Sequence, residues 1–363
     1  MGKIGGKALA DKYKDFLYPT AVVTAAGREI PENEFWHLEN VEVNASVRKE
    51  PDMAVLVYRA DKLPEKSRST LEGYFNVGQK MEIKAGYDNE KSRIFLGYLH
   101  QVEVCDLMED YLEYTLICLD VKGLMKNSNS LQVSGAQKAQ QVLEDILGDK
   151  GYAFLVDDTD ISPLPGKLNL NCVIRGDTHY SWLCSLAEYL NFEFYCGRGT
   201  VIFKKAGTGN GDTVELTGEY GLTAVQAVVS MTGQTGSISV YGYNRQDEAI
   251  RGNAEWTGGS QAFTQKMGQT LQGLSMKILC PELDTSEQAA AAAQAAMERA
   301  KAQCCRLEAQ CLGIPELQPG IHAQIKDENV SGLSGTIYVE EVCHLLDWQG
   351  YRSVVRGKGE KSF

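Results

Sequence analysis

The sequence has little positive charge and no long apolar run. Its 363 residues include 36 Lys and Arg against 48 Asp and Glu, a formal net charge of −12, so its long-range field repels nucleic-acid phosphates and anionic membrane surfaces. No run approaches the roughly 18 apolar residues that a membrane helix needs, and the first twenty residues mix Lys and Asp with short apolar stretches. We therefore expect no nucleic-acid binding, no membrane insertion and no export signal.

Common signatures of enzymes and metal sites are also missing. The sequence contains no HExxH, GxSxG, Walker A or CxxC motif. Histidine is scarce, and we interpret its five copies as sheet or interface residues: His37, His100, His179, His322 and His344. We expect no catalytic residue, no cofactor and no metal, and we interpret the chain as not an enzyme.

The ten cysteines show no spacing of a disulfide framework, so we expect reduced and mostly buried thiols. Cys304, Cys305 and Cys311 fall on a predicted helix that offers no fourth ligand at a suitable spacing, which argues against zinc. The glycine-rich stretch 207–211 precedes a strand pattern rather than the helix that a phosphate loop requires. It indicates a linker.

Acidic residues cluster twice. Asp157, Asp158 and Asp160 lack the glycine and distal glutamate of an EF-hand, which favours a solvated loop over a calcium site. We interpret the second group as a solvated hairpin tip, with an acidic channel face or a docking site for a basic partner as the alternative: Glu103, Asp106, Glu109, Asp110 and Glu113.

Strand patterns dominate residues 1–125. Apolar and polar residues alternate over 41–47, a period of two that marks a sheet with one wet face. The apolar run 53–58 predicts a central strand, and patterns at 93–105 and 112–121 predict a long hairpin. We predict a first, mainly antiparallel β-barrel-like domain.

An α/β segment follows. Apolar residues recur at helical spacing over 136–147 and again after Asp177, which we predict as an N-cap. Two short strands then flank a glycine turn at 197–199. We predict an inserted α/β domain over residues 126–208.

Residues 209–363 return to β patterns. Linking strands come first, and 252–272 lacks periodicity, which predicts a loop. A long Ala-rich helix is predicted over 286–312, with a capping box at Thr285 and a C-cap at Gly313. A Pro-Gly turn and three closing strands then complete a second β-barrel-like domain.

The closing strands of the two β domains resemble each other. Gly78 and Gly320 each precede an alternating strand, and the offset stays constant through the pairs Met81 with Ala323, Ile83 with Ile325 and Lys84 with Lys326. Further on, residues 102–107 resemble 341–345, and Cys105 matches Cys343. β sequences can match by chance because their compositions are alike, but the shared order of turn, strand, hairpin and terminus favours duplication.

The predicted fold class is therefore α+β and mainly β, with two related antiparallel β-barrel-like domains, an inserted α/β domain and a long Ala-rich helix. A homotrimer of such a chain would present about six quasi-equivalent units around its axis.

The stretch HYSWLCSLAEYLNFEFYCGRGTVIFKK at 179–205 resembles the phage late control protein D family and the related hub part of VgrG proteins. The matching positions are Trp182, Leu186, Ala187, Phe192, Phe194, Tyr195, Gly199 and Phe203. The stretch TGQTGSISVYGYNRQDEAIRGNAEW at 232–256 and the stretch from 315, PELQPGIHAQIKDENVSGLSGTIYVEEV, resemble further parts of the family in the expected order.

This resemblance implies a structural baseplate hub subunit of a phage tail or contractile injection system, in which the two β domains are tube domains. It implies a homotrimeric, pseudo-sixfold ring that joins the sixfold tail tube to a threefold spike, with strand edges completed by neighbouring copies. The implied partners are tail tube or tube-initiator proteins and other baseplate proteins. The implied location is the cytoplasm of the producing cell during assembly, and then the assembled particle.

VgrG chains continue into an OB-fold and a β-helical needle, whereas this sequence ends at Phe363, so we expect the spike to be a separate protein. Two alternatives stay open. A tail-associated cell-wall hydrolase would need convergent carboxylates in a cleft. A glycan-binding β protein could stack sugars on Trp36, Trp256 and Trp348, although aromatic packing in a core or interface is the simpler interpretation.

Overall fold

The computed structural model describes residues 2–48, 50–62, 64–106, 108, 110–127, 138–148, 152–157, 178–209, 211–243, 249–257, 262–280, 283–326 and 333–359. Five residues named above lie outside this part of the chain: Glu109, Asp158, Asp160, Asp177 and Phe363.

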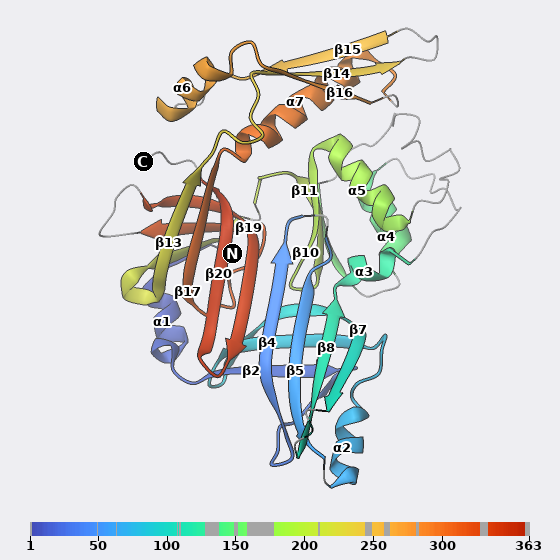
Figure 1. Ribbon diagram of the computed structural model, residues 1–363, viewed down its shortest axis with the longest axis vertical. Helices are drawn as coiled ribbons and strands as arrows, with labels where there is room; N and C mark the ends of the chain where they lie inside the picture. The colour runs from blue at the N-terminus through green and yellow to red at the C-terminus, as the bar shows by residue number, and fades with distance from the viewer. Residues whose placement is uncertain are drawn as a thin grey trace.

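Most strands belong to one continuous sheet, which fills the lower two thirds of Figure 1. Its strands run in the order β1-β12-β18-β19-β4-β5-β8-β7-β6-β2-β3, and β20, β17 and β13 continue from β19 on a branch. The other strands of the described residues form two three-stranded sheets. The mainly β fold is thus confirmed. Barrel-like closure of each domain stays a prediction, because the observed strand pairings join the two domains in one sheet.

Four antiparallel strands and one flanking strand form what we call the first β unit. They are β4 (Trp36–Ser46), β5 (Met53–Asp61), β8 (Tyr111–Leu119), β7 (Glu90–Asp106) and the flanking β6 (Lys80–Tyr87). Val41 and Val43 are buried whereas Glu42 and Asn44 are partly exposed, as the predicted alternation requires. β5 lies between β4 and β8, so the predicted central strand is confirmed.

The first β unit carries several short elements at its margins. They are the 3-10 helix η1 (Lys14–Phe16), β2 (Pro19–Ala25), β3 (Arg28–Glu29) and α2 (Glu65–Glu72). β1 (Lys3–Ile4) and α1 (Gly6–Lys12) precede them in the chain but lie next to β12 (Thr213–Thr217), with which β1 pairs. β2 pairs with β6, and α2 lies at the lower end of the molecule (Figure 1).

The second β unit has the same strand order. It consists of β13 (Leu222–Val229), β17 (Cys305–Leu312), β20 (Gly350–Gly359), β19 (Gly335–Asp347) and the flanking β18 (His322–Lys326). β12 (Thr213–Thr217) pairs with β18, and the 3-10 helix η3 (Gly218–Tyr220) leads into β13. The three predicted closing strands are confirmed.

The correspondence between the two units extends to their irregularities. β7 bulges against β8 between Leu99 and Gln101, and β19 bulges against β20 between Val339 and Glu341. A second pair of bulges separates Leu38 from Asn40 in β4 and Leu222 from Ala224 in β13. Because bulges are specific features of a sheet, two matched pairs support duplication over a chance match.

The predicted glycine correspondence is confirmed, and one later match needs a correction. Gly78 and Gly320 have φ of 90° and 81°, and their amides donate to the carbonyls of Leu99 and Val339, which are equivalent residues. Counting residues from the matched bulges, however, makes Cys105 equivalent to Leu345 rather than to Cys343. The sequence match was two residues out of register, because a shift of two keeps every side chain on the same face of a strand.

The inserted α/β segment has its own core. It contains α3 (Val121–Met125), α4 (Ala139–Leu147), β9 (Ala153–Val156), α5 (His179–Leu190), β10 (Phe192–Gly197) and β11 (Thr200–Lys205). Leu143, Trp182 and Phe203 share this core, and Thr178 caps α5, with its hydroxyl accepting from the amide of Ser181. The predicted helices and hairpin are confirmed, and the boundaries of the three domains stay our proposal.

A further small sheet at the top of Figure 1 was not predicted as a separate body. It consists of β14 (Ser237–Tyr243), β15 (Ala249–Glu255) and β16 (Ser275–Leu279), with α6 (Ala262–Leu271) beside it and α7 (Ser286–Ala302) packed on one face. The predicted loop over 252–272 is therefore wrong, since it holds the end of β15 and all of α6. All of this lies within the β13–β17 hairpin.

The predicted helix over 286–312 is also wrong in its second half. α7 begins as predicted, with the Thr285 hydroxyl accepting from the amide of Gln288, but it ends at Ala302. From Cys305 to Leu312 the chain is strand β17, in which apolar Leu307 and Ala309 are buried between polar neighbours. This period of two decides the structure because its apolar face completes the core, which outweighs helix propensity. The cysteines therefore do not share a helix face.

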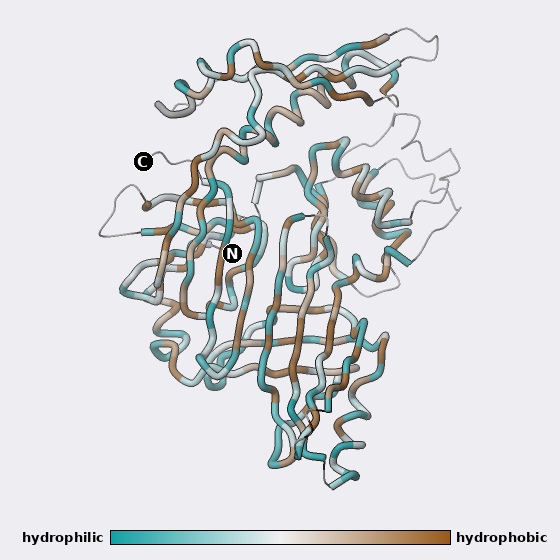
Figure 2. Tube along the Cα trace, viewed as in Figure 1, coloured by the Kyte–Doolittle hydropathy of each residue, from teal (hydrophilic) through white to brown (hydrophobic). Residues whose placement is uncertain are grey.

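Gly313 follows this strand and is no helix cap. A Cβ there would lie 2.0 Å from the ring of Tyr351, so a glycine is needed for close packing. Figure 2 shows apolar residues concentrated along the strands of the large sheet, and the main core spans both β units. The two units thus fold as one body.

Candidate functional site

The two β units meet along β4 and β19, which pair antiparallel from Val41 opposite Leu346 to Ser46 opposite Glu341. The junction is closely packed: Val342 is 2% exposed and His344 3% exposed. The Arg48 guanidinium lies 2.7 Å from the Glu341 carboxylate at its end. An edge strand of the first unit, β4, thus pairs with the long strand β19 of the second unit.

The first unit has an equivalent long strand, β7, but its second half carries a partner on one side only. Residues 101–106 pair with β8, and in the described part of the chain no strand pairs with their other side. Val104, which corresponds to the buried His344, is 57% exposed. We call residues 101–106 the β7 edge.

The second unit has the complementary feature in β13, which corresponds to β4. Among the described residues β13 pairs only with β17, and Thr223, Gln226 and Val228 are exposed. Val228 is 48% exposed. We call residues 225–230 the β13 edge. Because unpaired strand edges readily pair with another chain, these two edges are the candidate interaction site.

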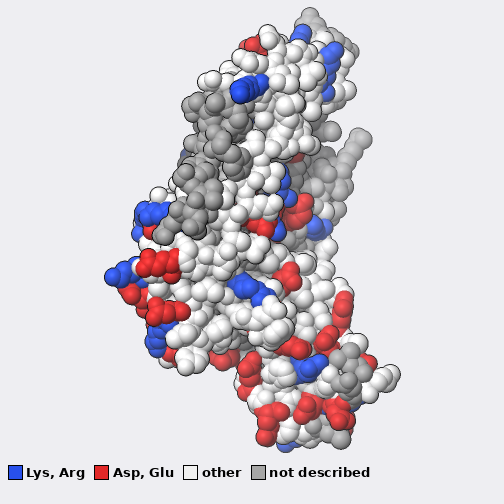
Figure 3. Space-filling model, turned by 60° about the vertical axis from the view of Figure 1, so that its left-hand side comes forward, with Lys and Arg blue, Asp and Glu red and all other residues white. Residues whose placement is uncertain are grey.

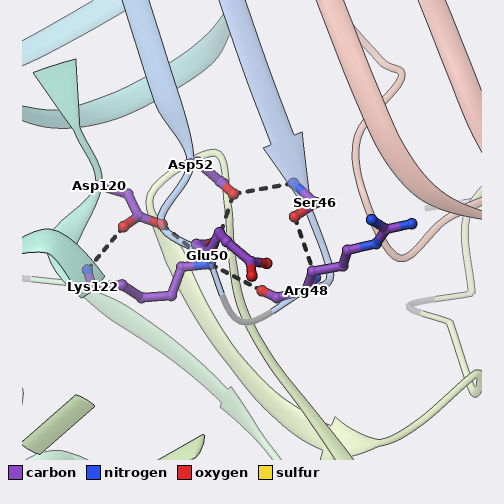
Figure 4. Close-up of polar contacts among 6 residues, drawn as sticks. All are labelled: Ser46, Arg48, Glu50, Asp52, Asp120 and Lys122. Atoms are coloured by element: carbon purple, nitrogen blue, oxygen red, sulfur yellow. Dashed lines mark hydrogen bonds and ion pairs between the residues drawn. The ribbon is translucent and has the colours of Figure 1, made fainter. Parts of the chain in front are cut away.

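A buried ion cluster fixes the start of the inserted domain beside the junction (Figure 4). The fully buried Lys122 ammonium donates to the carbonyl oxygens of Glu50 at 2.8 Å and Arg48 at 3.4 Å, and it lies 3.7 Å from Asp52 Oδ1 and 3.6 Å from Asp120 Oδ2. Asp52 Oδ1 also accepts from the amide of Ser46. The cluster ties the turn between β4 and β5 to the N-terminus of α3.

Burial controls the protonation of this cluster. Loss of hydration raises the pKa of the Asp52 carboxyl to about 8, against the opposing effect of the Lys122 ammonium. Burial lowers the pKa of Lys122, but the carboxylates of Asp120 and Asp52 outweigh it and hold the pKa above its usual value. Lys122, Asp52 and Asp120 thus form a buried charged cluster, which we interpret as structural.

The β10–β11 hairpin anchors the inserted domain to both β units. Its turn residues Arg198 and Gly199 both have positive φ. The Arg198 guanidinium donates to the carbonyl of Pro315 next to the second unit, and the Arg93 guanidinium of the first unit donates to the Arg198 carbonyl at 3.3 Å. Burial raises the pKa of Glu193, whose carboxylate accepts from the hydroxyl of Tyr338. These contacts hold the three parts together.

Two hollows among the described residues are poor substrate sites. A cavity of about 20 Å³ lies where the three parts meet, lined by residues such as Asp52, Asp120, Arg198 and His344, and it has room for about one water. A groove of about 470 Å³ beside α2 includes a single carboxylate, Glu34, among its lining residues. Asp52 and Asp120 both line the first cavity, but it is too small for a sugar, and the groove beside α2 lacks the pair of carboxylates that a glycoside hydrolase needs.

His344 lies inside the core. Burial lowers its pKa to about 4, so the imidazole is neutral at pH 7. Its Nε2 lies 3.1 Å from the Leu317 carbonyl oxygen, and its Nδ1 lies 3.0 Å from Ser353 Oγ and 2.9 Å from the Tyr351 hydroxyl oxygen. One ring nitrogen therefore donates and the other accepts, which is the pattern of a satisfied sheet histidine.

The three tryptophans considered for glycan stacking do not form one surface. Trp36 is 5% exposed and donates to the Pro31 carbonyl, Trp256 is partly buried under the Lys301 ammonium, and Trp348 is 86% exposed on the β19–β20 turn. Met108 is 87% exposed on the β7–β8 turn, which corresponds to that of Trp348. Stacking on all three rings at once is therefore ruled out.

The remaining candidates are the acidic residues, and Glu103, Asp106, Asp110 and Glu113 lie together on the β7–β8 hairpin, as predicted. Asp106 forms an ion pair with Lys62 at 2.7 Å on the exposed β7–β8 hairpin, and Asp157 Oδ2 accepts from the amide of Lys205.

Among the described residues no group of three or more His, Cys, Asp or Glu is placed to hold a metal ion. No helix in the same residues is long and apolar enough to cross a membrane. On the face shown in Figure 3, Asp and Glu gather at the lower end.

Comparison with known families gives one match that spans most of the chain. A family model described as the Alg8 N-terminal domain matches residues 17–347. The chain belongs to this family. The Alg8 N-terminal domain match covers the whole first β unit and the second β unit except β20, and it is a different family from the late control protein D family that the sequence resembles. No curated protein matches the sequence.

Solved structures show whose fold the chain shares. The 43 kDa tail protein of prophage MuSo2 from Shewanella oneidensis is 16% identical with a TM-score of 0.67, and the match covers 93% of this chain and 98% of that one. A tail protein from Neisseria meningitidis MC58 is 11% identical with a TM-score of 0.67, covering 94% and 96%. An E. coli type VI secretion system component is 11% identical with a TM-score of 0.54, covering 94% and 79%. At these identities the likeness establishes the fold.

Proposed function

We propose that this chain is a structural, non-enzymatic hub subunit in the baseplate of a phage tail or contractile injection system. In the proposed assembly three copies form a pseudo-sixfold ring, which joins the sixfold tail tube to a threefold spike. The repeated unit carries this proposal: two β units with the same strand order and two matched pairs of bulges lie side by side in one chain.

Three further observations support it. The shared fold belongs to tail proteins and to a secretion-system component over nearly the whole chain. The two β units share a core and one strand pairing, so each copy would enter a ring as a single body. Neither the small cavity nor the groove beside α2 combines room for a substrate with a pair of carboxylates, which weighs against the hydrolase alternative. The proposal rests on fold and repeat rather than on the description of the matched family.

The proposed partners follow from the symmetry. A sixfold tube or tube-initiator protein meets the six β units, a separate spike protein meets the threefold axis, and other baseplate proteins surround the ring. We place the subunit in the cytoplasm of the producing cell during assembly and then in the baseplate of the finished particle.

Light scattering on the full chain tests the ring. We expect a mass of three times 39.9 kDa, either alone or with the spike protein present. Negative-stain images of particles from producing cells, labelled through a tag on this chain, should place the label at the baseplate. A protein that stays monomeric with its spike, or a label that is absent from the baseplate, would contradict the proposal.

A peptidoglycan cleavage assay separates the hub from the hydrolase. We expect no turnover with the purified chain. Turnover that disappears on changing one carboxylate, with Glu34→Gln as the first variant because Glu34 lines the larger groove, would overturn the non-enzymatic assignment.

A further inference from the structure

We propose that neighbouring copies join by pairing the β7 edge of one copy, residues 101–106, with the β13 edge of the next, residues 225–230. The pairing is antiparallel and extends from Asp106 opposite Val225 to Gln101 opposite Ser230. This inference rests on the proposed ring and adds the surface, the register and the partner, which is a second copy of this chain.

The junction inside the chain supplies the template. There β4 of the first unit pairs with β19 of the second. Each unit therefore has two types of edge: β4 and β13 are of one type, and β7 and β19 are of the other. Inside the chain β4 pairs with β19, so one edge of each type, β7 and β13, remains unpaired among the described residues. Joining the remaining two repeats the same junction between copies in a head-to-tail manner, which is how closed rings form.

The matched bulges transfer the register residue by residue. On the β7 side, Gln101 directly follows the bulge and corresponds to Glu341. The β13 bulge, which lies where β4 has its own, makes Val225 correspond to Val41. Since Val41 pairs with Leu346, which corresponds to Asp106, Val225 pairs with Asp106 of the neighbouring copy.

Strand direction agrees with this register. β4 and β7 are three antiparallel pairings apart in the first unit, and β13 and β19 are three antiparallel pairings apart in the second. The β7 edge of one copy and the β13 edge of the next can therefore pair antiparallel, as β4 and β19 do inside the chain. No strand needs to reverse.

Burial shows what the pairing would cover. Val342 and His344 are buried in the internal junction, whereas the corresponding Val102 is half-buried and Val104 is 57% exposed. On the other edge Val228 is 48% exposed. In the proposed register Val104 lies opposite Ala227, and Val228 lies opposite Glu103. Valine is a strong strand former, and its exposure on both unpaired edges fits strands that are completed by assembly.

A natural cysteine makes the register testable. Cys105 is an exposed free thiol on the β7 edge and is placed opposite Gln226. Directly opposed residues of antiparallel strands have Cα atoms about 4.5–5.5 Å apart, within the range that a disulfide spans. Under mild oxidation, Gln226→Cys should give dimer and trimer bands on a non-reducing gel and nothing larger, because a closed ring of three has no free edge.

Two matched variants control for chance contact. Thr223→Cys is also exposed on β13 but lies three residues away, roughly 10 Å along the strand, and should not cross-link to Cys105. Cys105→Ser combined with Gln226→Cys should lose the bands. A second pair, Glu103→Cys with Val228→Cys in the Cys105→Ser background, should restore them.

The outcomes separate this inference from the proposed function. A trimer by light scattering that fails to cross-link through Gln226→Cys, or that cross-links as well through Thr223→Cys, overturns the pairing and leaves the hub standing. A chain that is monomeric at every concentration, alone and with the spike, overturns the ring and with it the pairing. Bands that follow the expected register support both.

Discussion

Lys122 shows how single residues hold the inserted domain in place. Its ammonium is fully buried, donates to two backbone carbonyl oxygens and lies near two carboxylates. The sequence gives no sign of this cluster, because Asp52 and Lys122 are 70 positions apart and meet only once β5 and β8 pair. Sequence patterns report the local period of burial, and they do not report such long-range charge pairs.

Replacing this lysine should be costly. Lys122→Met leaves buried carboxyl and carbonyl groups without their cation, so we expect it to lower the free energy of unfolding by about 3–5 kcal/mol. Lys84→Met on the partly exposed surface of β6 is the matched control and should change it by less than about 0.5 kcal/mol. Urea denaturation of both variants measures the difference, and equal effects would show that the cluster contributes nothing specific.

Asp52 should make stability depend on pH. Its folded pKa of about 8 lies above the roughly 4 of an unfolded aspartate, so between these values only the folded chain holds the proton. The free energy of unfolding therefore falls as pH rises through this window, by at most about 1.4 kcal/mol per pH unit. Asp52→Asn should flatten this slope when unfolding is followed between about pH 5 and pH 8.

Asp106→Asn is the control for that experiment. The ion pair with Lys62 lowers the pKa of this exposed carboxyl, so any contribution is lost only at more acidic pH. A slope that persists in Asp52→Asn, or that disappears equally in Asp106→Asn, would contradict the role assigned to Asp52.

Among the elements, strands and turns were easier to predict than the end of the long helix. Alternating burial over 41–47 and the Pro-Gly turn before β18 follow from local periodicity and from the backbone freedom of glycine. The run from Ser286 continues with helix-compatible residues past Ala302, yet β17 begins at Cys305. The sheet requires a strand between β13 and β20 to complete the core. Local sequence patterns do not report this requirement, because β13 and β20 lie far from β17 in the sequence.

The two equivalent glycines should differ in their tolerance of a side chain. Gly78→Ala and Gly320→Ala both place alanine at positive φ, which costs roughly 1–2 kcal/mol. A Cβ at 78 meets no atom within 4 Å, whereas a Cβ at 320 overlaps the Tyr195 hydroxyl. We expect the second variant to lose about 1–3 kcal/mol more.

Thermal unfolding of the two variants checks this difference, and Gly320→Ala combined with Tyr195→Phe should recover part of it. Equal losses at 78 and 320, with no recovery in the double variant, would mean that the inserted domain does not press against the β18 turn.

For the molecule as a whole, the sequence predicted the two related β domains and the inserted α/β domain, because duplicated turns and strand order survive in local patterns. The separate sheet of β14, β15 and β16 was not predicted, because its weak periodicity resembles a loop until α7 covers one face. The candidate interaction edges could not be predicted, since an unpaired edge is defined by which strands lie beside it.

The hairpin that holds this extra sheet distinguishes the two halves of the chain. β4 and β5 are joined by a short turn, whereas the equivalent β13 and β17 are separated by residues 230–304. A hairpin turn can accept such an insertion without disturbing the paired strands on either side. In a ring of three copies the six equivalent hairpins would alternate between β4–β5 hairpins with a short turn and β13–β17 hairpins that carry the extra sheet. A binding partner at this rim would thus meet threefold symmetry, although the β units of the ring repeat six times.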